Sequence, residues 1–203
     1  MNAVISAVST FFVYALMALF AQNTVLARGT GVSRLVQLVG DDDTSSLLFG
    51  LLLSVICVLN APLSWLIGTQ LNKLELRAML RPLVFVACTF VVCGLIWLVL
   101  TYVQNFPYKD RLLKMLPNAG FNTCVVGAML VTTVQRFTLA QTIGYSLGSG
   151  VGYLVAVLMV AEARRRLRSS AVPGPFRGLP IVMIYIGILA MAVYGFTGHT
   201  VAI

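Results

Sequence analysis

Residues 116–125 read LPNAGFNTCV and interrupt an otherwise apolar run from about 112 to 134. Proline lacks the backbone N–H that a helix needs, and glycine is a poor helix former, so a regular helix is not expected there. A second polar stretch, QNTVL at residues 22–26, closes the first apolar run of the chain. Both stretches contain an Asn-Thr pair, and the two pairs are 99 residues apart. The sequence therefore predicts two broken helices, one in each half of the chain.

The composition indicates that the chain lies in a lipid bilayer. Of its 203 residues, 59% are hydrophobic and only 10% are charged, against about 25% charged residues in an ordinary soluble domain. Lipid tails accept apolar side chains without penalty, so a bilayer can cover this surface. The net charge of +8 is explained by basic loops that lie beside the apolar runs and contact anionic headgroups. We expect an all-α integral membrane protein that does not bind nucleic acid.

Six apolar runs are long enough to cross a bilayer, which needs roughly 20 residues each. They cover about residues 4–27, 46–68, 82–103, 112–134, 138–161 and 179–196. The first run has no basic segment before it and no small-residue cleavage site after it, so we expect it to be retained as a span. The connecting loops are short, which predicts a single domain over residues 1–203.

Three spans separate the two Asn-Thr stretches. Because three is odd, the halves, about 1–105 and 106–203, would have opposite orientations, which is the pattern of an inverted-topology repeat. In such folds the broken helices meet near the membrane midplane, where irregular backbone lines a site. The prediction is six transmembrane helices arranged as two inverted three-helix repeats, with helices one and four interrupted.

The distribution of Lys and Arg predicts the orientation. Ten of the fourteen fall in the loops after spans one, three and five, and cytoplasmic loops are enriched in these residues. The ten are Arg28, Arg34, Lys109, Arg111, Lys114, Arg164, Arg165, Arg166, Arg168 and Arg177. We expect these loops in the cytoplasm and both termini outside.

Polar side chains within the spans are few and uncharged. No Asp, Glu, Lys, Arg or His lies in the middle of a span, although proton relays depend on such residues. The candidate site is a midplane cluster of Asn23, Thr24, Asn122 and Thr123, whose amide and hydroxyl oxygens suit a hard cation such as Na⁺. Two interpretations stay open: the cluster lines an ion path, or it only satisfies the backbone of the broken helices. No metal-binding cluster is expected.

Three glycines, Gly144, Gly148 and Gly152, are spaced by four in the fifth span and form a smooth helix face. Such a face lets another backbone approach closely, either in a subunit interface or within the chain. The mid-span cysteines Cys57 and Cys88, together with Cys93, are expected to act as small hydrophobic residues, and no disulfide framework is expected.

The C-terminal part contains the most specific pattern. Residues 171–178 read AVPGPFRG, and the last span continues with GILAMA at 187–192 and closes on GFTG at 195–198. Asn23 and Val25-Leu26 are followed by GVS at 31–33. These stretches resemble the Rnf/Nqr membrane-subunit family, above all the A-type subunit of Rnf complexes and the E-type subunit of Na⁺-pumping NADH:quinone oxidoreductase.

The resemblance extends over the whole chain and implies a function. It implies paired membrane subunits of the bacterial cytoplasmic (inner) membrane, in complexes that move electrons between NADH and ferredoxin or quinone and transport Na⁺ or H⁺. It implies a homologous six-helix sister subunit, together with other redox subunits, as partners. It also implies an iron–sulfur cluster shared with the sister subunit, to which each chain contributes two cysteines.

The sequence departs from the family at both cysteine positions. The stretch that holds the first cysteine is shortened here to RGT at residues 28–30. At the second position, directly after Asn122, Thr123 stands, and Cys124 follows one residue later, about 100° further around a helix. Hydroxyl groups do not replace thiolates as cluster ligands. Cys124 is the one candidate cofactor-binding residue, and no cofactor is assigned on it.

The function predicted is that of a membrane subunit in an ion-translocating electron transport complex of Rnf/Nqr type, with a structural or ion-path role. Two alternatives are a membrane scaffold and a non-redox inverted-repeat transporter subunit. No nucleophile with an adjacent base is visible within the spans. The chain is therefore at most one subunit of a multi-subunit oxidoreductase or translocase.

Overall fold

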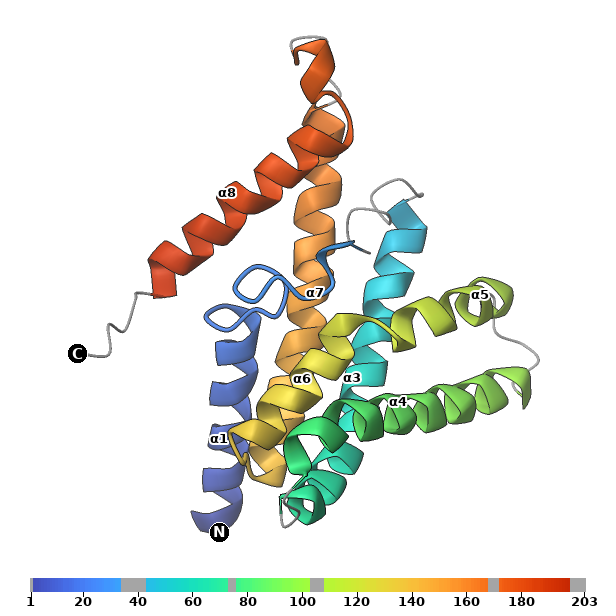
Figure 1. The fold of residues 1–203 in the computed structure, drawn as a ribbon, viewed down its shortest axis with the longest axis vertical. Coiled ribbons are helices and arrows are strands. Elements are labelled where there is room, and N and C mark those ends of the chain that lie inside the picture. Colours follow the sequence, from blue (N-terminus) through green and yellow to red (C-terminus); the bar gives the residue numbers. More distant parts are fainter. Residues whose placement is uncertain (1, 34–42, 73–75, 103–107, 168–171, 198–203) are drawn as a thin grey trace.

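The computed structural model describes residues 2–33, 43–72, 76–102, 108–167 and 172–197, and every regular element within them is helical (Figure 1). The helices are α1 (Asn2–Leu19), α3 (Asp43–Leu71), α4 (Arg77–Tyr102), α5 (Lys109–Gly120), α6 (Thr123–Val134), α7 (Leu139–Leu167) and α8 (Leu179–Thr197), with a 3₁₀ turn, η1 (Gly174–Phe176), before α8. The all-α prediction is confirmed. Arg34 and Arg168 of the basic loops, and positions 171 and 198 of the C-terminal motif, lie outside the described residues.

Three of the described helices, α3, α4 and α7, are long and apolar enough to cross a membrane. Helices α5 and α6 together form a fourth candidate span, bent by 48° at the break between them. Helices α1 and α8 contain shorter apolar stretches, Ile5–Leu19 and Leu179–Gly195. By length and composition the described residues thus contain three spans, or four with the bent pair.

The first predicted span, residues 4–27, is wrong at its end, because α1 stops at Leu19 and turns follow through residue 31. Part of this turn segment is apolar, so hydropathy alone predicted a helix that continues beyond Leu19. The break in the fourth predicted span is present but falls at Phe121 and Asn122. Pro117 remains inside α5, and the new helix begins where the Asn122 side chain can cap it.

Helix α7 occupies the centre of the bundle, with α1 on one side and α3 on another, and α6 also packs on it (Figure 1). Its Tyr145 and Tyr153 are fully buried, as are Phe49 and Leu53 of α3. Helices α3 and α7 contain 29 residues each, which corresponds to about 44 Å at 1.5 Å per residue. These two helices form the frame on which the shorter elements are placed.

The glycine stripe of α7 faces α1. A Cβ atom at Gly144 would overlap the backbone carbonyl of Phe11, and one at Gly148 would overlap the carbonyl of Ala15. At Gly152 a Cβ would lie 2.9 Å from the Asn23 side-chain nitrogen. The three glycines therefore allow α1 and the loop after it to lie directly on α7, within the same chain.

Large apolar side chains cover the outside of the bundle. Helix α4 exposes Phe90 and Trp97, and α8 exposes Ile188 and Met191. Helix α8 packs against α7 and then diverges from the other helices (Figure 1). Such faces are typical of helices that contact lipid or the helices of other subunits, because lipid tails and apolar side chains are equivalent neighbours.

Candidate functional site

The loop after α1 is organised by the side chain of Asn23, which is only 3% exposed. Its Nδ2 donates to the carbonyl of Leu19 at 3.0 Å and to that of Gly152 at 3.3 Å. Its Oδ1 accepts from the backbone N–H groups of Val25 at 3.0 Å and Leu26 at 3.1 Å. One amide therefore ends α1, attaches the loop to α7 and satisfies two buried N–H groups, which lipid cannot do.

The loop then folds back on itself. The carbonyl of Thr24 accepts from the backbone N–H of Thr30 at 2.9 Å and from its hydroxyl at 2.6 Å. Gly31 has a φ of +81°, and a Cβ there would lie 2.7 Å from the Oδ1 of Asn122 and 2.8 Å from the ring of Tyr153. Glycine is required at this position both for its backbone conformation and for its close contact with the second broken helix.

Asn122 is the N-cap of α6 and is 4% exposed. Its Oδ1 accepts from the backbone N–H of Cys124 at 2.9 Å, and its Nδ2 donates to the Tyr153 hydroxyl at 3.2 Å. Tyr153 was missed by the sequence reasoning. The sequence feature that could have identified it is a tyrosine directly after Gly152, the last glycine of the stripe. A buried Tyr hydroxyl needs a polar partner.

The structure brings the two broken segments into direct contact. The backbone N–H of Gly31 donates to the Thr123 hydroxyl at 2.7 Å, and the Thr24 hydroxyl lies 3.1 Å from the Cys124 sulfur, where either group can donate. We call Asn23, Thr24, Asn122, Thr123 and Cys124 the polar junction. All five were candidate site residues, and they come from segments about 100 residues apart.

A cavity of about 350 Å³ adjoins the polar junction. It lies between Gly31 and Ser33 of the loop and Phe121, Asn122 and Thr123 at the α5–α6 break. Thr123 is exposed on its lining. Of the polar junction, Asn122 and Thr123 are thus the residues that line this cavity.

Cys124 does not line this cavity. It is completely buried, and its thiol interacts with that of Cys57 on α3 as well as with Thr24. Cys88 and Cys93 are also buried and free. Within the described residues, no group of three or more His, Cys, Asp or Glu side chains is placed to hold a metal ion.

The family model described as "Rnf-Nqr subunit, membrane protein" matches residues 11–200, and the chain belongs to this family of membrane proteins. It is similar to the A subunit of the ion-translocating oxidoreductase complex of Cereibacter sphaeroides, with 30% identity over 93% of this chain and 96% of that protein. The protein of the same name from Aeromonas salmonicida is 34% identical, over 60% of this chain and 62% of the relative. The one from Pasteurella multocida is 32% identical over 66% of this chain and 70% of the relative. The resemblance to the Rnf/Nqr family is confirmed.

Proposed function

We propose that this chain is the A-type membrane subunit of an ion-translocating oxidoreductase complex in a bacterial cytoplasmic membrane. The observation that carries the proposal is the likeness to the Cereibacter sphaeroides protein along nearly the whole of both chains. The chain works with a homologous sister protein and with redox subunits that bind the electron carriers. The alternatives, a scaffold and a non-redox transporter subunit, have no relative with a matching name among these similar proteins.

The topology that fits this function has six spans in two inverted repeats, about 1–105 and 106–203, with both termini outside. Helices α1 and α8 have 18 and 19 residues, or about 27–29 Å, close to the roughly 30 Å of the hydrocarbon core. The contact between Gly31 and Thr123 supports the repeat, because it joins the broken segment of one half to that of the other.

The residues present do not fit the cluster that the family implies. Thr30 and Thr123 stand in the two ligand regions, and both hydroxyls are engaged with loop backbone. Cys124, the one thiol in the polar junction, faces Cys57 and Thr24 inside the chain and not the cavity. Cluster iron needs thiolate or imidazole ligands. We therefore propose that this subunit supplies no cluster ligand.

Within the complex, the main role of the polar junction is to hold the two broken segments together. Each asparagine oxygen accepts from a backbone N–H that the break leaves unpaired. A second candidate role is an ion path, which is favoured by the cavity that reaches Thr123. Hydroxyl and carbonyl oxygens there would replace part of a cation's hydration shell.

Purification of the tagged chain from native membranes under gentle conditions tests the proposed function. We expect a homologous six-helix protein and flavin- and iron–sulfur-binding subunits in the same fraction. Recovery with an ATPase or a solute-binding protein instead would overturn the assignment. Iron content then tests the cluster proposal, because Cys124→Ala should leave the iron of the complex unchanged, whereas a loss of about two iron atoms per complex would show ligation of a two-iron cluster.

The ion path is tested with Thr123→Val in the complete complex, because valine keeps the shape and removes the hydroxyl of a residue that lines the cavity. We expect slower ion flux at an unchanged level of assembled complex. Thr101→Val, the same change at an exposed threonine of α4 that does not line this cavity, is the matched control. Normal flux in a correctly assembled Thr123→Val complex would leave only the structural role.

A further inference from the structure

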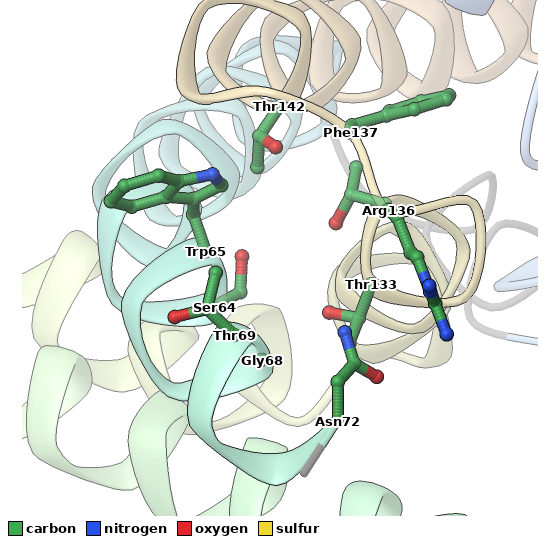
Figure 2. A pocket seen from close by; sticks show the side chains of 10 residues that line it. Ser64, Trp65, Gly68, Thr69, Asn72, Thr133, Arg136, Phe137 and Thr142 are labelled. Atoms are coloured by element: carbon green, nitrogen blue, oxygen red, sulfur yellow. The ribbon is translucent and has the colours of Figure 1, made fainter.

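A second cavity lies at the end of the bundle where α7 begins (Figure 2). Its volume is about 290 Å³, and it opens between the last turns of α3, the end of α6 and the first turns of α7. Its lining includes Ser64, Trp65, Thr132, Thr133, Arg136 and Thr142. None of them belongs to the polar junction or to the cavity beside it.

Thr133 has a polar atom without a protein partner. The side chain is only 6% exposed, and its hydroxyl oxygen is buried with no hydrogen bond among the described residues. Figure 2 shows this hydroxyl directed into the cavity, towards α3. Gly68 of α3 leaves room for it, because a Cβ there would lie 2.9 Å from the Thr133 oxygen. A buried hydroxyl without a partner is unfavourable, so the site is incomplete without a ligand.

The other hydroxyls in the cavity already donate to backbone carbonyls, and they belong to Ser64, Thr69, Thr132 and Thr142. Ser64 donates to Ala61 at 2.9 Å, Thr132 to Met129 at 3.0 Å and Thr142 to Thr138 at 2.9 Å, in each case to a backbone carbonyl. Each oxygen keeps lone pairs that can accept. A ligand that matches these three positions therefore brings hydrogen-bond donors, such as hydroxyl groups of its own.

The charge at the cavity is positive. Arg136 is exposed at the rim, in the turn between α6 and α7, where it has a φ of +53° (Figure 2). Arg81 of α4 donates at 2.6 Å to the side chain of Asn72, which also lines the cavity. Among the described residues, no acidic side chain lines it. A cation is therefore disfavoured and an anionic group is favoured at this end of the molecule.

The depth of the cavity matches the headgroup layer of a bilayer. Helices α3 and α7, with 29 residues each, exceed the roughly 30 Å of the hydrocarbon core, so their ends lie among headgroups. On α3 the cavity is lined by residues between Ser64 and Asn72, at the very end of the helix, and Trp65 lies at the position where interfacial tryptophans are common. A ligand of this cavity is thus drawn from the membrane surface.

We infer that this cavity binds the phosphoglycerol headgroup of an anionic membrane lipid. The phosphate accepts a hydrogen bond from the hydroxyl of Thr133, and the positive charge of Arg136 at the rim favours the anionic group. The glycerol hydroxyls donate to the oxygens of Ser64, Thr132 and Thr142. The lipid then joins α3, α6 and α7 at the end of the bundle opposite to the basic segment of Arg164, Arg165 and Arg166.

The test is native mass spectrometry of the full chain in mild detergent, titrated with phosphatidylglycerol, with phosphatidylcholine or with free glycerol 3-phosphate. We expect one phosphatidylglycerol retained per chain and little phosphatidylcholine. Thr133→Val should lower retention about tenfold, as the loss of one charge-assisted hydrogen bond predicts, and Arg136→Gln should lower retention through the loss of a positive charge at the rim. Arg164→Gln removes a positive charge at the opposite end and should leave retention unchanged.

Three other results would overturn the proposed lipid site. Equal retention by the parent and by both cavity variants would place the lipid elsewhere, and loss only in Arg164→Gln would place it at the basic segment. Competition by free glycerol 3-phosphate at the same concentration as the lipid would show a soluble ligand. Thermal unfolding without added lipid verifies that the variants are folded, and added phosphatidylglycerol should stabilise the parent but not Thr133→Val. The assay uses this chain alone, so it is independent of the redox partners.

Discussion

At the residue scale, two asparagine side chains supply the hydrogen bonds that backbone N–H groups lack at the helix breaks, where lipid offers no partner. Asn23 and Asn122 each present a side-chain oxygen to backbone N–H groups that the helix breaks leave unpaired. Each also anchors its segment to α7, Asn23 through the carbonyl of Gly152 and Asn122 through the hydroxyl of Tyr153. The sequence predicted the two residues as a pair, but it did not show that both contact α7.

Asn122→Ala should destabilise the chain by about 2 kcal/mol, because it removes an N-cap and leaves the buried Tyr153 hydroxyl without its donor. The measurement is reversible unfolding of the purified chain in detergent with increasing denaturing detergent. Asn118→Ala is the control, since Asn118 is exposed on α5 and lies in the same short stretch of chain. Equal stability of the two variants would contradict the capping role of Asn122.

At the element scale, the close approach of α1 to α7 positions the first broken segment. Gly144 and Gly148 meet backbone carbonyls of α1, and Gly152 meets the side chain of Asn23. The spacing by four was visible in sequence, and it predicted a smooth face. Whether that face contacts another subunit or the same chain depends on the path of α1, which no local pattern contains.

Gly148→Ala should separate α1 from α7 and lower the stability of the chain by about 2 kcal/mol or more, because a Cβ there has no space beside Ala15. Gly187→Ala on α8 is the matched control, since a Cβ at Gly187 meets nothing within 4 Å. Alanine is the better helix former by about 1 kcal/mol, so the control should be neutral or stabilising. Thermal unfolding in detergent compares the two, and an unchanged Gly148→Ala would disprove close packing of α1.

At the scale of the whole molecule, the placement of charge relates the bundle to the membrane. Arg136 lies at the end where α7 begins, and Arg177 lies in the turn between η1 and α8, beyond the other end of α7. The excess of basic residues on the side of Arg177 predicts that this side is cytoplasmic. The topology and the assembly of the complex both depend on this orientation.

Labelling of single cysteines tests the orientation. The four native cysteines are buried, so the parent chain should react little with a thiol reagent. Arg136→Cys and Arg177→Cys each introduce one exposed thiol. In intact cells a membrane-impermeant maleimide should label Arg136→Cys, while Arg177→Cys should react only after permeabilisation. The reverse pattern would invert the proposed topology, and labelling of the parent chain measures the background.

The sequence by itself determined the class of protein, the long apolar helices α3, α4 and α7 and the family, because apolar composition and a long C-terminal motif are local properties. It also located both helix breaks within a few residues, since Asn, Pro and Gly act on their own backbone. Only the tertiary structure decided where α1 ends, which residues face Asn122 and Cys124, and that Ser64, Thr133 and Thr142 share a cavity. Those facts depend on the packing of segments far apart in the chain, where side-chain shape and unpaired hydrogen-bonding groups select the partner.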